Sequence, residues 1–122
     1  MVSLLPFRSL SPIHDQVGEV AGPPYDVMNR AEARELINGK PNSILRVTRP
    51  DALLNDSIPG DSPQTYDVAR EELKRLVDQG VLKFDDDDSY YIYAQVMGSH
   101  RQTGIVGLAS AEDYWADRIK KH

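Results

Sequence analysis

Cysteine is absent from this sequence of 122 residues. Without thiols the chain can form neither a disulfide framework nor a zinc site built on thiolates, and its composition fits a reducing compartment. A metal site would need carboxylates together with the three histidines, which are His14, His100 and His122. We predict no metal site, make no prediction of a cofactor, and expect a cytoplasmic protein.

Long apolar runs and an excess of basic residues are also missing. Before Arg8 the large apolar residues are only Val2, Leu4, Leu5 and Phe7, too few for the hydrophobic region of a signal peptide or for a membrane span. The 14 basic and 19 acidic residues give a net charge of −5. This charge disfavours attraction to nucleic acid or to an anionic membrane, so we expect neither as a partner.

The composition that remains is that of one ordinary globular domain. The chain is 40% hydrophobic and 27% charged, and its length is sufficient for a single hydrophobic core. Its last residues, Ile119-Lys120-Lys121-His122, follow a helical turn without a further turn or a polar tail. We expect residues 1–122 to be a single domain and the N-terminal fragment of a longer protein.

A first helix is predicted by its cap. Asn29 followed three residues later by Glu32 is an asparagine variant of the capping box. Ala33, Leu36 and Ile37 then give the helix an apolar stripe, and Gly39 is expected to end it. The pattern predicts a helix over residues 30–38.

A second and longer helix is predicted up to Gly80. Ser62 or Asp61 can act as its cap, with Pro63 in the first turn. Apolar residues then recur at the three- and four-residue spacing of one helix face. They are Tyr66, Ala69, Leu73, Leu76 and Val77.

Several segments have the β-branched and aromatic content of strands. The predicted strands cover residues 4–8, 43–48, 81–84, 90–97 and 103–109, and the last is interrupted by Gly104 and Gly107. Residues 51–63 read as a loop. Residues 81–84 and 90–97 are expected to form a hairpin across the aspartate turn. Residues 98–101 are expected to turn the chain again before the strand at 103–109, which gives an antiparallel meander. Ser110 is expected to begin a final helical turn. The fold class predicted is α+β, an antiparallel sheet of four or five strands with two main helices on one face.

The candidate binding residues include two arginines at the end of the strand predicted over residues 43–48. Arg46 and Arg49 flank Val47-Thr48, and two guanidinium groups with the Thr48 hydroxyl can hold a phosphate or a carboxylate. The alternative is structural. Arg46 and Thr48 then share a solvated strand face, and Arg49 pairs with Asp51.

Tyr25 and Asp26 follow Pro23-Pro24, which restricts the direction in which the chain leaves the turn. A carboxylate held there can act as a base or orient Arg46. The structural alternative places Tyr25 in the core and makes Asp26 a turn cap.

A further candidate is His100, expected at a hairpin tip, where it could contact a phosphate or could simply be exposed. The run Asp85 to Asp88 lacks the alternation of a calcium loop, and we interpret it as a solvated turn. No P-loop, dinucleotide-binding glycine pattern, nucleophile elbow or zinc signature occurs in the sequence.

Five segments occur together in the order and spacing of a known bacterial family. They are Pro6-Phe7-Arg8, Pro23-Pro24-Tyr25-Asp26-Val27, Leu45-Arg46-Val47-Thr48-Arg49-Pro50, Gly104-Ile105-Val106-Gly107 and Ile119-Lys120-Lys121-His122. Over essentially its whole length the chain resembles the N-terminal part of domain-of-unknown-function family 1015. The resemblance implies a protein about three times longer, whose C-terminal half is similar to the ParB and sulfiredoxin-like fold, some relatives of which bind nucleotide and phosphorylate small molecules.

None of the residues of that half is present, so the resemblance implies that catalysis, if any, occurs mainly outside this chain. We expect the chain to bind an anionic small molecule, such as a nucleotide or a phosphorylated metabolite, and to associate with the C-terminal half. The alternative is a binding or regulatory module without catalytic activity that is similar to a winged helix. Against this alternative, the wing would carry the aspartates at its tip, where they would repel phosphate.

Overall fold

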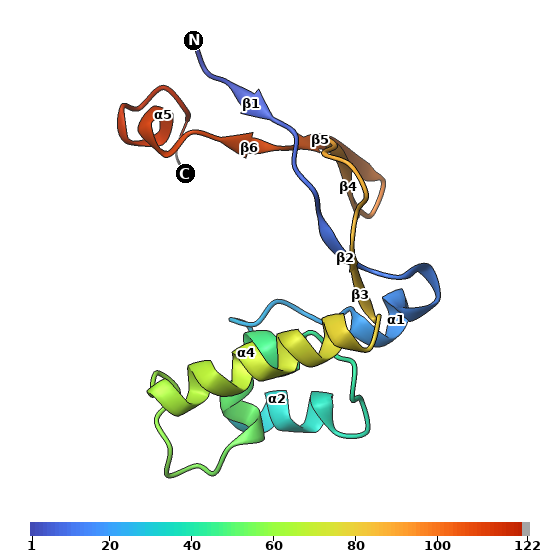
Figure 1. Cartoon of the computed structure of the whole chain (residues 1–122), viewed down its shortest axis with the longest axis vertical. Helices are drawn as coiled ribbons and strands as arrows, with labels where there is room; N and C mark the ends of the chain where they lie inside the picture. Colours follow the sequence, from blue (N-terminus) through green and yellow to red (C-terminus); the bar gives the residue numbers. More distant parts are fainter. Residues whose placement is uncertain (121–122) are drawn as a thin grey trace. The chain divides into compact units, whose positions relative to one another are not determined.

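The structure is a computed structural model and describes residues 1–120 of the chain (Figure 1). It divides into two compact units. The helical unit comprises Ser11–Lys83, and the sheet unit comprises Met1–Leu10 together with the chain from Phe84 onward. No helix among residues 1–120 combines the length and the apolar character needed to cross a membrane.

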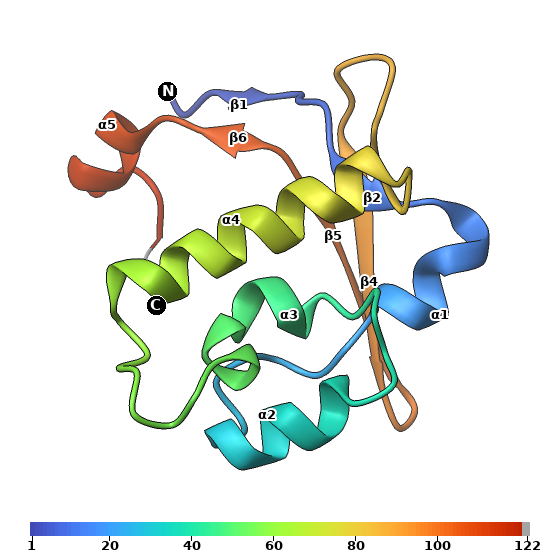
Figure 2. The same cartoon turned by 60° about the horizontal axis from the view of Figure 1, so that its bottom comes forward.

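Six helical segments make up most of the helical unit. They are the 3-10 helix η1 (His14–Gln16), α1 (Val17–Val20), α2 (Arg30–Ile37), α3 (Leu45–Thr48), the 3-10 helix η2 (Pro50–Leu53) and α4 (Pro63–Asp78). Figure 2 shows α3 lying between α2 and α4, and α3 makes contacts with both.

Helix α2 begins with the predicted capping box. The Asn29 side chain accepts a hydrogen bond from the Glu32 backbone N–H at 3.0 Å, and the Glu32 carboxylate accepts one from the Asn29 N–H at 2.8 Å. Beyond the last helical residue, Ile37, the chain reverses through Gly39, whose φ is +70°. The helix predicted over residues 30–38 is therefore confirmed.

Helix α4 is also confirmed. The Ser62 hydroxyl accepts from the Thr65 N–H at 3.3 Å, Pro63 occupies the first turn, and Gly80 follows the helix with a φ of +71°. Of the predicted apolar stripe, Leu76 is completely buried but Tyr66 is exposed. The stripe therefore packs against the unit over only part of its length.

The core of the helical unit is a cluster of small and medium apolar side chains from α2, α3 and η2. Its buried members are Ala33, Ile37, Leu45 and Ala52, and the partly buried Met28 and Leu53 pack against them. Because these side chains come from three short segments, the packing of each segment depends on the other two.

The strand predicted over residues 43–48 is wrong, because this segment forms α3. The Ser43 hydroxyl accepts from the Leu45 N–H at 3.3 Å, and the Arg49 N–H donates to the Leu45 carbonyl at 2.7 Å. Leu45 is buried between neighbouring helices. Tertiary burial has overridden the β-propensity of the local sequence.

The strands of the described residues form three two-stranded sheets. The prediction of one sheet with four or five strands is therefore wrong. The pairs are β1 (Leu4–Leu5) with β6 (Leu108–Ala109), β2 (Leu10–Pro12) with β3 (Leu82–Phe84), and β4 (Tyr91–Met97) with β5 (His100–Val106). The α+β class itself holds, since both helices and strands are present.

The hairpin predicted between residues 81–84 and 90–97 is wrong as well. The strand at Leu82–Phe84 exists, but it pairs with β2. After it, the Asp85 N–H donates to the Ser9 carbonyl at 3.0 Å, which keeps the chain beside the N-terminal segment. The second predicted turn is confirmed, because β4 pairs antiparallel with β5 through Gly98, with Met97 opposite His100.

The C-terminal part of the sheet unit follows the sequence more closely. Gly107 separates β5 from β6 as predicted, whereas Gly104 lies inside β5 opposite Tyr93. Ser110 begins α5 (Ala111–Trp115), and its hydroxyl accepts from the Glu112 N–H at 3.1 Å. The predicted edge strand at residues 4–8 is shorter than expected, since β1 covers only Leu4–Leu5.

Candidate functional site

Arg49 connects the double-proline turn to the segment that follows α3. Its Nη1 donates to the carbonyl oxygens of Tyr25 at 3.2 Å and Met28 at 2.6 Å. Its Nε and Nη2 donate to the two carboxylate oxygens of Asp51 at 3.0 and 2.9 Å. The structural alternative for Arg49, a pair with Asp51, is confirmed, and four of its five N–H groups are engaged within the protein.

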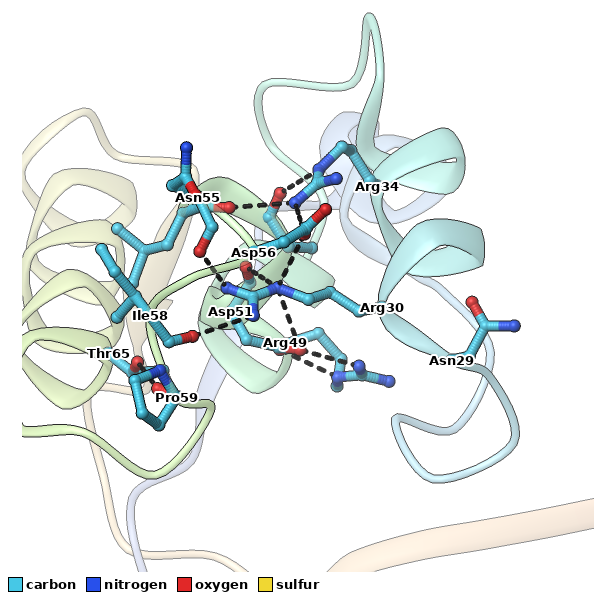
Figure 3. Close-up of polar contacts among 12 residues, drawn as sticks. Asn29, Arg30, Arg34, Arg49, Asp51, Asn55, Asp56, Ile58, Pro59 and Thr65 are labelled. Carbon is cyan, nitrogen blue, oxygen red and sulfur yellow. Dashed lines mark hydrogen bonds and ion pairs between the residues drawn. The ribbon is translucent and has the colours of Figure 1, made fainter.

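Two arginines one turn apart on α2 bind η2 and the loop that follows it (Figure 3). Arg30 donates to the backbone carbonyls of Asp51, Asn55 and Ile58 at 2.8 to 3.0 Å. Arg34 donates to those of Ala52 at 3.1 Å and Leu54 at 2.9 Å, and it pairs with the Asp56 carboxylate at 2.8 Å.

The three guanidinium groups of Arg30, Arg34 and Arg49 are paired with two carboxylates, those of Asp51 and Asp56. This set, the arginine cluster, therefore carries one positive charge in excess. Hydrogen bonds from Arg49 lower the pKa of Asp51, against the opposing effect of partial burial. The hydrogen bond from Arg34 lowers the pKa of Asp56 in the same way.

Arg46 belongs to a separate ion-pair group. Its Nε donates to the Glu72 carboxylate at 2.7 Å, and Arg75 Nη2 donates to the same oxygen at 2.9 Å. Burial raises the pKa of Glu72, but the hydrogen bonds from Arg75 and Arg46 outweigh it and leave that pKa below the usual value. Two cations share one carboxylate, so this group too has a positive charge in excess.

A cavity of about 690 Å³, the α2 cavity, lies beside α2. Its lining residues are Ala31, Arg34, Glu35, Ile37, Asn38, Gly39, Arg46, Ala52 and Leu53. Arg34 uses Nε and Nη2, and Arg46 uses Nε, for their bonds to the protein. Within residues 1–120 nothing accepts from Arg34 Nη1 or from either Nη of Arg46. The cavity thus combines an apolar wall with unused guanidinium N–H groups.

The predicted site residues lie in different places. Arg46 lines the α2 cavity, whereas Thr48 and Arg49 line a second cavity of about 380 Å³ with Tyr66. Thr48 donates to the Ile44 carbonyl at 3.3 Å within its own helix. The idea that Arg46 and Thr48 share a solvated strand face is wrong, because both lie on α3 and Arg46 is paired.

Tyr25 and Asp26 are both exposed at the double-proline turn. A long hydrogen bond closes this turn, from the Val27 N–H to the Pro24 carbonyl at 3.4 Å. The structural alternative that placed Tyr25 in the core is wrong, since 59% of the residue is exposed. Tyr25 accepts the hydrogen bond from Arg49 through its backbone carbonyl and not through its side chain.

His100 is the first residue of β5, not part of the turn, and it is exposed in the sheet unit. It lines a cavity of about 540 Å³ together with residues of the same hairpin. Asp86, Asp87 and Asp88 are exposed, as predicted for a solvated turn. Asp85 departs from the prediction, because it is half-buried and its carboxylate accepts from the hydroxyl groups of Ser9 and Tyr91. His122 lies outside the described residues.

Sequence reasoning missed Arg34, Arg30 and Glu72. The spacing of Arg30 and Arg34 places them on one side of α2, which could have been read from the sequence once the capping box had fixed the helix. Most acceptors of Arg30 and Arg34 are backbone carbonyls of η2 and of the loop after it, and nothing in the sequence indicates these.

A family described as "Protein of unknown function (DUF1015)" matches residues 4–122. No curated protein and no solved structure matches the chain. The matched range includes α2, α3, α4 and the complete arginine cluster. Because this range is nearly the whole sequence, the chain belongs to the DUF1015 family.

Proposed function

We propose that the helical unit binds an anionic small molecule in the α2 cavity. The observation that carries the proposal is that Arg34 and Arg46 line one cavity and each keeps N–H groups that no described residue accepts. Guanidinium groups bind phosphates and carboxylates through paired, charge-assisted hydrogen bonds. Arg46 is thus a contact residue, as the sequence suggested, and Arg34 joins it.

The charges around the cavity favour an anion despite the net charge of −5. Arg34 belongs to the arginine cluster, and Arg46 shares Glu72 with Arg75, so each arginine comes from a group with an excess positive charge. Two such groups at one cavity create a local positive potential on an acidic protein. Their existing ion pairs also hold both side chains in place, which reduces the entropy lost on binding.

The apolar part of the lining indicates that the ligand is more than a bare inorganic ion. Ile37, Ala52 and Leu53 provide carbon surface next to the arginines. The volume of about 690 Å³ is in the range of small-molecule sites in proteins. A phosphorylated or carboxylated metabolite with a short carbon skeleton fits this combination.

Within this proposal, Arg49 has a positioning role. Since it bonds to the carbonyls of Tyr25 and Met28 and to Asp51, it fixes the double-proline turn relative to η2. Ala52 and Leu53 of η2 line the cavity. Arg49 therefore sets the shape of one wall without donating to the ligand.

The proposal is tested by titrating the ¹⁵N-labelled chain with phosphate, AMP and a monocarboxylate such as butyrate while recording amide shifts. We expect shifts at residues 31–39, at Arg46 and at Ala52–Leu53. Arg46→Gln should weaken binding by about tenfold, the effect of losing one charge-assisted contact. The matched control is Arg70→Gln, since Arg70 is an exposed arginine of α4 paired only with Asp67.

Arg46→Gln is suited to this test because Glu72 keeps Arg75 as a partner. The absence of α2 shifts with all three probes at millimolar concentration would refute the proposal. Equal weakening by Arg46→Gln and Arg70→Gln would also refute it, because it would show a general charge effect.

The alternative of a winged-helix-like module loses its main support. The wing was to be a hairpin of residues 81–84 and 90–97, but β3 pairs with β2 and β4 pairs with β5. No other observation in the structure favours this alternative.

A further inference from the structure

We infer that the ligand of the α2 cavity is a zwitterion, a molecule in which an ammonium group and an acid group are joined by a short carbon chain. This inference rests on the proposed function and specifies its ligand class. The observation that carries it is Glu35, an unpaired carboxylate on the same cavity wall as the two arginines.

Glu35 has no counter-ion among the described residues. Residues three and four positions away along a helix are its neighbours on the surface. Around Glu35 these are Ala31, Glu32, Asn38 and Gly39, and none of them is basic. Glu32 is already committed to the capping box through the Asn29 N–H.

Unlike Glu35, the two arginines that line the cavity each have an ion-pair partner within the protein. Arg34 pairs with Asp56 at 2.8 Å, and Arg46 pairs with Glu72 at 2.7 Å. The Glu35 side chain is exposed, and its carboxylate accepts no hydrogen bond from residues 1–120. The cavity therefore offers unused cationic donors and one unpaired anionic acceptor, with Ile37 and Ala52 as apolar lining.

A simple anion satisfies only half of this arrangement. Bound to the arginines, it would share the cavity with the Glu35 carboxylate and would be repelled by it. A ligand that also carries an ammonium group turns this repulsion into an attraction. Complementarity to both charges is the means by which a site selects one charge pattern over another.

Asn38 supports the same assignment. It follows α2, lines the cavity, and its side-chain amide has no partner among the described residues. An amide can donate to an acid group and accept from an ammonium group, so it suits a ligand that presents both. Glu35 also lines an adjoining cavity of about 420 Å³ with Val27, Met28 and Leu36, which gives room for an amine-bearing chain.

The experiment compares three probes with the same carbon skeleton, 4-aminobutyrate, butyrate and butylamine, by amide-shift titration of the full chain. Because the separation of the two charges that fits best is not fixed in advance, glycine and 6-aminohexanoate extend the zwitterion series. We expect one of the zwitterions to bind about tenfold more tightly than butyrate. Glu35→Gln should abolish this preference while leaving butyrate binding equal or stronger.

The control variant is Glu71→Gln, which removes an exposed glutamate of α4 and should leave the preference unchanged. This inference would be overturned if butyrate and phosphate bound as tightly as every zwitterion. It would also be overturned if the preference for a zwitterion survived Glu35→Gln. Either result would leave the proposed function standing. No shift at α2 with any probe, phosphate included, would overturn the proposed function and this inference together. Loss of the preference in Glu71→Gln would overturn the role assigned to Glu35.

Discussion

Arg49 and Asp51, two positions apart in sequence, form a bidentate ion pair. Nε and Nη2 of the arginine lie 3.0 and 2.9 Å from the two carboxylate oxygens. The side chains are only 15% and 14% exposed. Since Asp51 orients the guanidinium, Nη1 can reach the carbonyls of Tyr25 and Met28. The pair therefore connects two segments of the helical unit that are far apart in sequence.

Arg49→Met should destabilise the helical unit. The substitution keeps much of the side-chain volume but leaves Asp51 without its main partner and two carbonyl oxygens without a donor. Losing hydrogen bonds to charged groups in a partly buried position costs about 2 to 3 kcal/mol. Urea unfolding followed by circular dichroism should show a lower midpoint, and the matched control Arg70→Met should not. A midpoint that is unchanged in Arg49→Met would contradict the connecting role.

Stability should fall in acid as Asp51 and Glu72 become protonated. Both carboxyl groups have a pKa below the usual value in the folded protein, Asp51 through Arg49, and Glu72 through Arg75 and Arg46 in spite of burial. A carboxyl whose pKa is depressed on folding contributes stability that is complete above its unfolded pKa. That contribution is lost as the pH falls through the lower, folded value.

We therefore expect the free energy of unfolding to decrease as the pH falls below about 4. In Asp51→Asn the decrease should be smaller, because one of the titrating groups is gone, and Asp87→Asn provides a control at an exposed aspartate. Urea titrations at a series of pH values measure this. Identical slopes in the parent and Asp51→Asn would show that Asp51 does not take part.

The local features of this fold could be predicted from the sequence. Asn29, Ser62 and Ser110 cap helices because a cap depends on residues within one turn of itself. For the same reason, Gly39 and Gly80 could be identified as helix ends. These predictions need no knowledge of distant segments.

The features that depend on distant contacts could not be predicted. Residues 43–48 have strand-like composition, but the burial of Leu45 against other helices favours the helical conformation of α3. The strand at Leu82–Phe84 was found, yet its partner β2 is about seventy residues away in sequence. Arg34 was missed because its acceptors in η2 and in the loop after it are mostly backbone oxygens, which any residue supplies.

Asn29→Ala should lower the stability of α2 and with it the core of the helical unit. The substitution removes the acceptor for the Glu32 N–H, and loss of such a cap typically costs about 1 kcal/mol. The control Gln64→Ala replaces an exposed side chain in the first turn of α4. Hydrogen exchange of the α2 amides should accelerate in Asn29→Ala alone. Unchanged protection would mean that tertiary packing holds α2 without its cap.

The last prediction compares two glycines of the sheet unit. A Cβ on Gly107 would lie 2.8 Å from Leu4 Cγ and 3.1 Å from the Leu5 carbonyl oxygen, whereas a Cβ on Gly104 would meet nothing within 4 Å. The Leu4 side chain can move away, but the Leu5 backbone is held in the pairing of β1 with β6, where Leu5 lies opposite Leu108. Gly107→Ala should therefore push β1 away from β6. Gly104→Ala should leave β5 in place, and it removes an entropic disadvantage of glycine in a strand.

Amide exchange provides the measurement. We expect parental rates in Gly104→Ala and faster exchange in Gly107→Ala at Leu4, Leu5, Leu108 and Ala109. Parental rates in both variants would show that the close approach of Gly107 to β1 is not needed for the pairing.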